Sequence, residues 1–243
     1  MLISRHGVLF LTVVFVISAR GTWPQIANPA VPAALASAQI VEEMQRHNLA
    51  RTNALKSLKS TRHYQAEYRG FSKKIVAGME VEYSYDAKSG KRFRIVAQSG
   101  SKMICDKVLK RAVDSELEAS KNSGATALTP ANYKFHLAEI DSVGGRPAYV
   151  LDVEPVAPSK FLYRGKIWVD AAEFALVMID AEPAKNPSFW ISRTRIRQTF
   201  AKTGGFWLPE MNRSESKVRI GGTAVFTIDY GRYQIETNEP HLR

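Results

Sequence analysis

Polar and apolar residues alternate along most of the chain, most clearly in residues 161–209. From Phe161 to Asp170 the odd positions are apolar or small, whereas the even positions include Arg164 and Lys166. A period of two is typical of a strand with one buried face. Turn residues follow, among them the Gly-Gly pair that ends at Gly205, and they favour hairpins. This stretch therefore predicts a curved antiparallel sheet with one apolar face.

Similar alternation occurs on both sides of this central stretch, and it predicts further strands. The apolar faces are clearest in residues 61–70, 80–86, 92–98, 133–137, 149–153 and 224–230. Residues 212–220 also alternate, but they are polar, which indicates an edge strand or an outward-facing strand. The phase of the alternation shifts between Tyr230 and Tyr233, so we predict a β-bulge at Gly231.

Two segments have helical rather than strand periodicity. A rough apolar stripe predicts a helix over residues 39–58, and a second helix is expected from Asp106, as N-cap, to about Lys121. The pattern gives about ten strands and two helices. We therefore predict a single α+β domain over residues 39–238, a strongly curved antiparallel sheet with helices across its open side.

The N-terminus has the pattern of an export signal. Arg5 precedes an apolar run from Val8 to Ala19, which is shorter than the roughly 20 residues of a membrane-spanning helix. Residues 1–19 are predicted to be a signal peptide, and residues 20–38 a Pro/Ala-rich linker or an extended signal region. Cleavage is expected after Ala19 or after Ala38, and an uncleaved anchor is the alternative. We expect a periplasmic protein.

Composition narrows the classes of function. The formal net charge is +11, which would suit anionic partners, but a solvated basic surface is the favoured interpretation. The single cysteine, Cys105, cannot form an intramolecular disulfide, and a buried structural role is expected for it. Arg193, Arg195 and Arg197 share one strand face. A solvated face is the favoured interpretation for them, ahead of binding to phosphates or head groups.

Catalytic and metal-binding signatures are absent from the sequence. The five histidines lack helical metal spacing, and neither H-E-x-x-H, nor G-x-S-x-G, nor a phosphate-binding glycine loop occurs. No catalytic residue, metal ligand or cofactor is predicted, and an enzyme is the least favoured class.

Large apolar side chains on the predicted strand faces are the positive signal. If helices leave part of this face uncovered, the residues would line a cavity of lipid size. If the helices cover it, the same residues form an ordinary core. The predicted cavity-lining residues are Tyr83, Tyr85, Phe93, Ile95, Tyr133, Phe135, Tyr149, Leu151, Phe161, Tyr163, Ile167, Val169, Phe226 and Ile228.

Three segments carry a resemblance to a known family. The runs Gly165–Asp170 and Gly205–Pro209, with the ending Thr227–Ile235, resemble the outer-membrane lipoprotein-sorting (LolA/LolB-like) superfamily. The resemblance covers residues 39–236 and implies an incomplete β-barrel, closed by helices, with an apolar cavity for acyl chains. Because no cysteine lies near the signal segment, it implies a soluble member rather than a lipid-anchored one.

Pattern and resemblance together predict a binding protein without catalysis. The expected ligand is an acyl chain, a lipid or a lipoprotein, carried in the periplasm by a monomer that makes transient contact with a membrane. The alternative is an envelope regulatory or sensor module that binds a partner protein. No nucleic-acid partner is expected.

Overall fold

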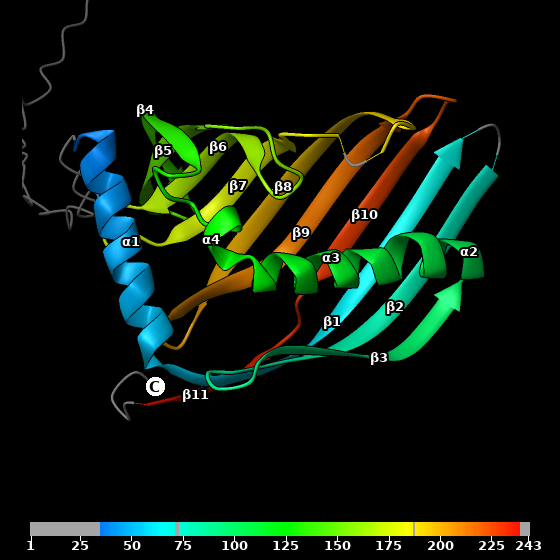
Figure 1. Ribbon diagram of the computed structural model, residues 1–243, viewed down its shortest axis with the longest axis horizontal. Coiled ribbons are helices and arrows are strands. Elements are labelled where there is room, and N and C mark those ends of the chain that lie inside the picture. The colour runs from blue at the N-terminus through cyan, green and yellow to red at the C-terminus, as the bar shows by residue number, and fades with distance from the viewer. Residues whose placement is uncertain (1–34, 71–72, 187, 239–243) are drawn as a thin grey trace, which may run out of the picture. The chain divides into compact units, whose positions relative to one another are not determined.

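The computed structural model describes residues 35–70, 73–186 and 188–238, so the predicted signal peptide lies outside the described residues. The described chain forms one eleven-stranded antiparallel sheet, with the order β3-β2-β1-β10-β9-β8-β7-β6-β5-β4 and with β11 paired to β1 (Figure 1). Its strands are β1 Leu55–Gly70, β2 Lys73–Asp86, β3 Gly90–Gly100, β4 Tyr133–Val143, β5 Arg146–Pro155, β6 Tyr163–Asp170, β7 Leu176–Pro183, β8 Ile191–Thr203, β9 Phe206–Val218, β10 Thr223–Asp229 and β11 Tyr233–Thr237.

The sheet is strongly curved and does not close, because β3 and β4 remain at its two edges. The helices lie across its hollow side (Figure 1). They are α1 Ser37–Ala54, α2 Lys102–Ile104, the π-helical turn η1 Cys105–Leu109, α3 Lys110–Lys121 and α4 Ser123–Thr126. The predicted fold class, a curved antiparallel sheet forming an incomplete barrel with helices, is confirmed.

Helix α1 covers the β4–β7 end of the sheet. Its apolar stripe, Ile40, Val41 and Met44, is fully buried against the inner faces of these strands. Each of these side chains contributes roughly 1.5–3 kcal/mol through burial. This end of the sheet is therefore a filled hydrophobic core.

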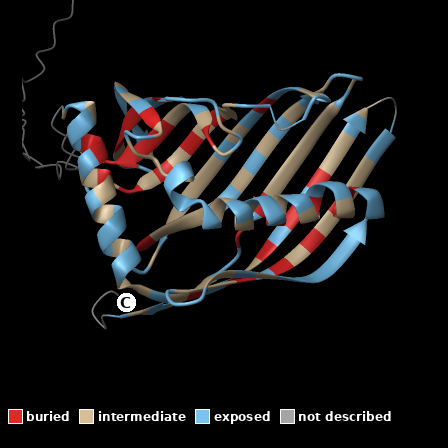
Figure 2. Ribbon diagram, viewed as in Figure 1, coloured by how far each residue is buried: buried red, intermediate tan, exposed pale blue. Residues whose placement is uncertain are grey.

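The segment α2–η1–α3 covers the other end of the sheet. Ile104, Cys105 and Leu109 pack against buried residues of β1, β2 and β10. Between these two cores most residues of β8, β9 and β10 are intermediate or exposed rather than buried (Figure 2). The middle of the hollow face is thus packed less densely than its two ends.

Two predicted helix boundaries were wrong. The first helix ends at Ala54, and residues 55–58 begin strand β1. Buried Ser60 and Arg62 alternate with exposed positions on β1, and their polarity hid the strand pattern in the sequence. The second helical segment begins at Lys102, because the Ser101 hydroxyl, 3.4 Å from the Ile104 amide nitrogen, caps it in place of Asp106.

Two further predictions are corrected at the C-terminal end. Residues 212–218 belong to β9, which is a central strand between β8 and β10, not an edge strand. At Gly231 the chain leaves β10 and enters β11, with a positive φ of 57°. Both strands pair with β1, and the register moves by one residue between His63–Asp229 and Ser60–Tyr233. The extra residue that the phase shift predicts is therefore present, but it separates two strands instead of lying within one.

Candidate functional site: a cavity between the two helical covers

A cavity of about 870 Å³ lies over the middle of the sheet. Its walls come from the end of α1 at Thr52, from α3 at Ala112, Ser115 and Glu116, and from the inner faces of the sheet. This volume lies within the range of roughly 300–1,000 Å³ that small-molecule sites occupy. The sheet residues are Leu55, Leu58, Arg62, Tyr83, Tyr85, Lys91, Pro183, Thr194, Ile196, Gln198, Leu208, Pro209, Asn212, Ser214, Ser216, Phe226, Ile228, Tyr230 and Tyr233.

The floor of the cavity, on β8 and β9, is partly polar but uncharged. The hydroxyls of Thr194 and Ser216 lie 2.8 Å apart, and Asn212 donates its amide to Gln198 at 3.1 Å. Because these groups bond to each other, an apolar ligand that lies over them leaves few hydrogen bonds unmade. The floor can therefore face water when the cavity is empty and a hydrocarbon chain when it is filled.

The opposite wall is charged and aromatic. Arg62 is only 3% exposed, and its Nη1 donates to Oε1 of Glu116 at 2.6 Å. Its guanidinium lies 3.6 Å from the ring centroid of Tyr83 and 4.8 Å from that of Tyr230. Burial alone would lower the pKa of Arg62, but the charge and hydrogen bond of Glu116 reverse this and raise it. The guanidinium is therefore a fixed positive charge.

Burial also governs the pKa values of two tyrosines beside the Arg62–Glu116 pair, Tyr83 in the cavity wall and Tyr64 in the adjoining core. It raises the pKa of Tyr83 to about 12, although the neighbouring Arg62 acts in the opposite direction. Burial, reinforced by the charge of Glu116, raises the pKa of Tyr64 to about 12 as well. Both phenols are neutral at physiological pH, so they present aromatic surface rather than an acid–base group.

The structure divides the predicted lining residues between two environments. Part of the set, Tyr83, Tyr85, Phe226 and Ile228, lines the cavity. A larger part packs into the core beneath α1, where the helix fills the space: Tyr133, Phe135, Tyr149, Leu151, Tyr163, Ile167 and Val169. The inner face of β4–β7 is thus an ordinary core, which was the alternative to a cavity in the sequence analysis.

The remaining predicted residues lie elsewhere. Phe93 packs against Tyr83, with 5.2 Å between ring centroids, next to the α2–α3 core. Ile95 is exposed on β3, the edge strand. Phe161 precedes β6, and the Lys160 ammonium lies 4.8 Å from its ring centroid.

Sequence reasoning missed the polar half of the cavity, on β8 and β9, and its charged residues Arg62, Lys91 and Glu116. A search for apolar strand faces excludes such residues by design. The polar alternation of residues 212–218 was the available signal, since a central strand with a polar inner face must border a hydrated space.

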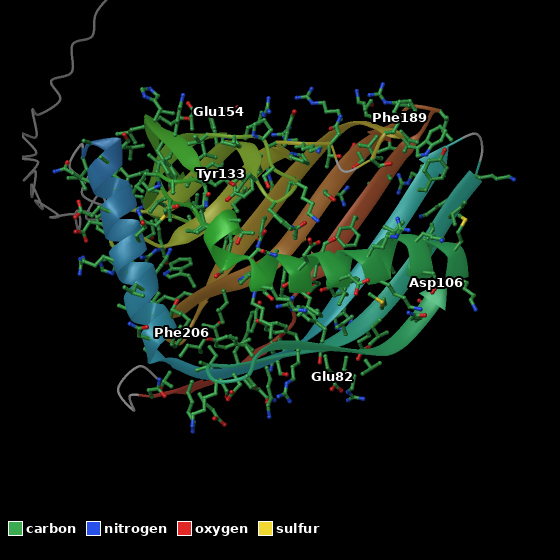
Figure 3. All side chains as sticks on the ribbon, viewed as in Figure 1. Glu82, Asp106, Tyr133, Glu154, Phe189 and Phe206 are labelled. Atoms are coloured by element: carbon green, nitrogen blue, oxygen red, sulfur yellow. The ribbon has the colours of Figure 1, made fainter. Side chains whose placement is uncertain are left out.

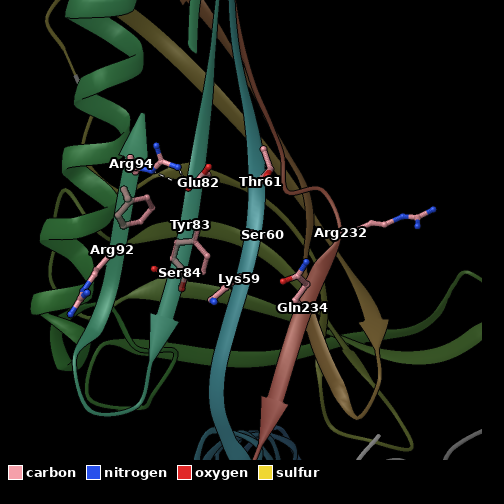
Figure 4. Close-up of a pocket in the computed structure, with 11 residues that line it drawn as sticks. Lys59, Ser60, Thr61, Glu82, Tyr83, Ser84, Arg92, Arg94, Arg232 and Gln234 are labelled. Atoms are coloured by element: carbon pink, nitrogen blue, oxygen red, sulfur yellow. Dashed lines mark hydrogen bonds and ion pairs between the residues drawn. The ribbon is translucent and has the colours of Figure 1, made fainter. Parts of the chain in front are cut away.

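A second hollow, of about 790 Å³, lies over β1, β2, β3 and β11 (Figure 4). The register pairs Glu82 with Arg94 and Ser84 with Arg92, on the sheet face opposite to Tyr83 and the cavity. Arg94 donates to Glu82 at 3.0 Å, which leaves a basic excess. The polar residues that line this outer groove are Lys59, Ser60, Thr61, Glu82, Ser84, Arg92, Arg94, Arg232 and Gln234.

The other arginine row on the outer face is internally paired. Arg195 and Arg197 both bind Asp180, and Arg193 binds Glu182, all on the exposed surface. Among the described residues, no group of three or more His, Cys, Asp or Glu side chains is placed to hold a metal ion. None of the described helices combines the length and the hydrophobicity needed to cross a membrane.

Comparison with known proteins gives structural but no sequence relatives: no family model matches the chain, and neither does any curated protein. A LolA superfamily protein from Nitrosomonas europaea is 11% identical, with a TM-score of 0.40, over 84% of this chain and 94% of that chain. A DUF1329 family protein from Desulfovibrio piger is 12% identical, with a TM-score of 0.44, over 85% of this chain and 95% of that chain.

An outer-membrane lipoprotein-sorting protein domain from Vibrio parahaemolyticus is 10% identical, with a TM-score of 0.39, over 84% of this chain and 95% of that chain. At these identities and TM-scores the likeness remains a resemblance and assigns neither a family nor a function. The incomplete barrel with helices that the sequence resemblance implies is present in the structure.

Proposed function

We propose that this protein is a non-enzymatic carrier that binds the acyl chain of a lipid or lipoprotein in the cavity between α1 and α3. The supporting observation is the 870 Å³ space over β8–β10, which two filled cores flank. Each methylene that leaves water for the apolar part of this lining contributes about 0.8 kcal/mol. A chain with ten buried methylenes would therefore gain about 8 kcal/mol before the cost of ordering is subtracted.

The cavity geometry also suggests how a ligand is released. α3 contributes Ala112, Ser115 and Glu116 to one wall, and α1 contributes Thr52 to another. Hydrophobic burial has no directional contacts that could be broken one by one. Movement of a helix away from the sheet is therefore the simplest way to expose the chain. The export signal predicted for residues 1–19 assigns this activity to the periplasm.

Native mass spectrometry of the protein purified from a cell envelope tests the proposal, with a fluorescent fatty-acid titration beside it. A co-purified lipid and saturable probe binding are expected. Ser214→Phe places a ring in the cavity and should abolish both, whereas Arg213→Phe, on the opposite face of β9, should leave both unchanged. Absence of bound lipid and of probe binding in the wild type would refute a carrier role.

An aromatic patch at one end of the sheet supports the transient membrane contact expected of such a carrier. Phe189, Trp190 and Ile220 are 76%, 57% and 60% exposed, and Arg219 lies 5.5 Å from the ring centroid of Phe189. Figure 3 shows Phe189 at the end of the long central strands opposite to Phe206. Exposed aromatic side chains beside a cation suit the boundary between lipid head groups and hydrocarbon.

Tryptophan fluorescence tests this contact with phosphatidylglycerol vesicles and neutral phosphatidylcholine vesicles. A blue shift is expected with the anionic vesicles. Trp190→Phe should remove it, whereas Trp207→Phe, at the other end of the sheet, should retain it. Equal spectra with and without vesicles would exclude membrane contact by this patch.

Binding of a partner protein is the second candidate function, and the free edge of β3 favours it. β3 pairs only with β2 among the described strands, and Arg92 and Arg94 face the outer groove beside it. An extended acidic segment could add to this edge and place its side chains near the arginines. A synthetic acidic β-strand peptide, measured by fluorescence anisotropy, should bind the wild type and not the Arg92→Glu, Arg94→Glu double variant. Lys134→Glu, on the opposite edge strand, is the charge control.

A further inference from the structure

Three charged side chains line the otherwise neutral cavity: Arg62, Lys91 and Glu116. Glu116 already has a donor on each carboxylate oxygen, from Arg62 at 2.6 Å and from the Tyr64 hydroxyl at 3.3 Å. Its hydrogen-bonding capacity toward the cavity is therefore largely taken up. Two cations and one carboxylate leave the wall with one net positive charge.

Lys91 is the cation without a partner. It enters the cavity from β3 beside Tyr85, its cross-strand neighbour. Within the part of the chain that the structure describes, the Lys91 ammonium makes no hydrogen bond and no ion pair. A half-buried ammonium normally has a partner, because removing an unpaired charge from water is costly.

The surroundings of Lys91 do not favour its charge. Burial is the main cause that lowers the pKa of the ammonium; Glu116 raises it in part, and Arg62 lowers it further. The Nε of Arg62, which lines the same cavity, is also buried without a partner. An anion bound beside Lys91 would stabilise its charge, because an opposite charge nearby favours the ammonium form.

We propose that Lys91 and Arg62 form a head-group subsite, so that the ligand is an amphiphile with a carboxylate or phosphate at one end of its chain. The head group would lie against the Lys91 ammonium, with Arg62 adding a second positive charge behind it. The chain would extend over Ile196, Leu208 and Phe226, which line the same cavity. This inference rests on the proposed carrier function and specifies its ligand class.

Chain-matched probes test the subsite by displacement of a neutral fluorescent lipid. Palmitate is compared with hexadecanol, and lysophosphatidate with the corresponding monoacylglycerol. At least one acid is expected to bind about tenfold or more tightly than its neutral partner. Whichever acid has the larger preference over its neutral partner shows whether the subsite favours a carboxylate or a phosphate. In Lys91→Met the acid should fall to the affinity of the neutral compound, which itself should not change.

Two controls separate the subsite from other causes. Lys91→Arg should restore the preference for the acid, and Lys59→Met, on the outer face of β1, should leave it intact. If acid and neutral probes bind the wild type equally, or if Lys91→Met weakens both alike, the subsite is refuted while the carrier function stands. If no probe binds, both proposals fail.

Discussion

Arg62 of β1 and Glu116 of α3 form an ion pair beside the cavity, with 2.6 Å between Nη1 and Oε1. The Arg62 side chain is buried, and Glu116 keeps about a quarter of its side chain exposed. The pair connects the helix over the cavity to the sheet beneath it. The Tyr64 hydroxyl completes the arrangement by donating to the second carboxylate oxygen.

Glu116→Gln should therefore destabilise the fold by about 3 kcal/mol, because it leaves the Arg62 guanidinium buried without a counter-charge. Urea unfolding at pH 7 measures the difference. Glu118→Gln, on the same helix, removes an exposed pair with Lys160 and should change stability by less than about 1 kcal/mol. Equal effects of the two substitutions would show that the Arg62–Glu116 pair adds no more to the free energy of unfolding than an exposed pair does.

The buried carboxylate of Asp170 should make stability depend on acid pH. Burial opposes ionisation of Asp170, but two bonds from Arg146 and the backbone amides of Ala172 and Glu173 outweigh it and lower its pKa. A depressed folded-state pKa adds stability that is present above the unfolded value of about 3.9. That stability is lost as the pH falls through the folded-state pKa.

Asp170→Asn should accordingly cost about 3 kcal/mol at pH 7, since Arg146 loses its buried partner. The difference from the wild type should shrink as the pH falls below about 4. Urea unfolding at pH 7, 5, 4 and 3 measures it. A difference that stays constant across this range would contradict the role given to the Asp170 carboxylate.

The same region shows how much of the fold the sequence contained. Of the three family-like segments, one ends in Asp170 and another contains Trp207, whose indole donates to Glu173 at 3.0 Å. Arg146 bonds both Asp170 and Glu173, so these two segments meet at one structural junction. Strand alternation and these motifs sufficed to predict the curved sheet, because the two sheet faces differ in polarity wherever one is buried.

The site was less predictable, for a physical reason. Apolar alternation marks burial, and burial occurs both beneath a helix and in an open cavity. Tyr149 and Phe226 have the same strand pattern, yet Tyr149 is buried in the core beneath α1, whereas Phe226 lies at the margin of the α2–α3 core and lines the cavity. Which strands the helices cover depends on tertiary packing. The polar residues Ser214 and Ser216 indicate a hydrated cavity only once β9 is known to be a central strand.

Gly231 should be intolerant of any side chain. Its φ is 57°, and an added Cβ would lie 2.3 Å from the carbonyl oxygen of Thr61. Gly231→Ala should cost at least about 2 kcal/mol, from strain and clash together. Gly90 has a φ of 78° but nothing within 4 Å of its Cβ position, so Gly90→Ala should cost only about 1 kcal/mol. Thermal melting compares the two, and equal losses would rule out the clash.

A pair of isoleucine substitutions tests the division between filled core and open cavity. Ile167 is completely buried beneath α1, whereas Ile196 is half-buried in the cavity lining. In Ile167→Asp a carboxylate would be trapped among apolar side chains, so a loss of several kcal/mol and unfolding are expected. In Ile196→Asp the carboxylate can keep water, so the fold should survive with a loss of about 1 kcal/mol.

Binding should respond in the opposite order. Folded Ile196→Asp should bind a fluorescent acyl probe at least about tenfold more weakly than the wild type, because each passing methylene meets a hydrated charge. Circular dichroism melting and probe titration on the same samples separate folding from binding. Undiminished binding by Ile196→Asp would exclude the cavity as the acyl site. A stably folded Ile167→Asp would show instead that α1 does not seal the core over β6, and that the ligand space extends beneath it.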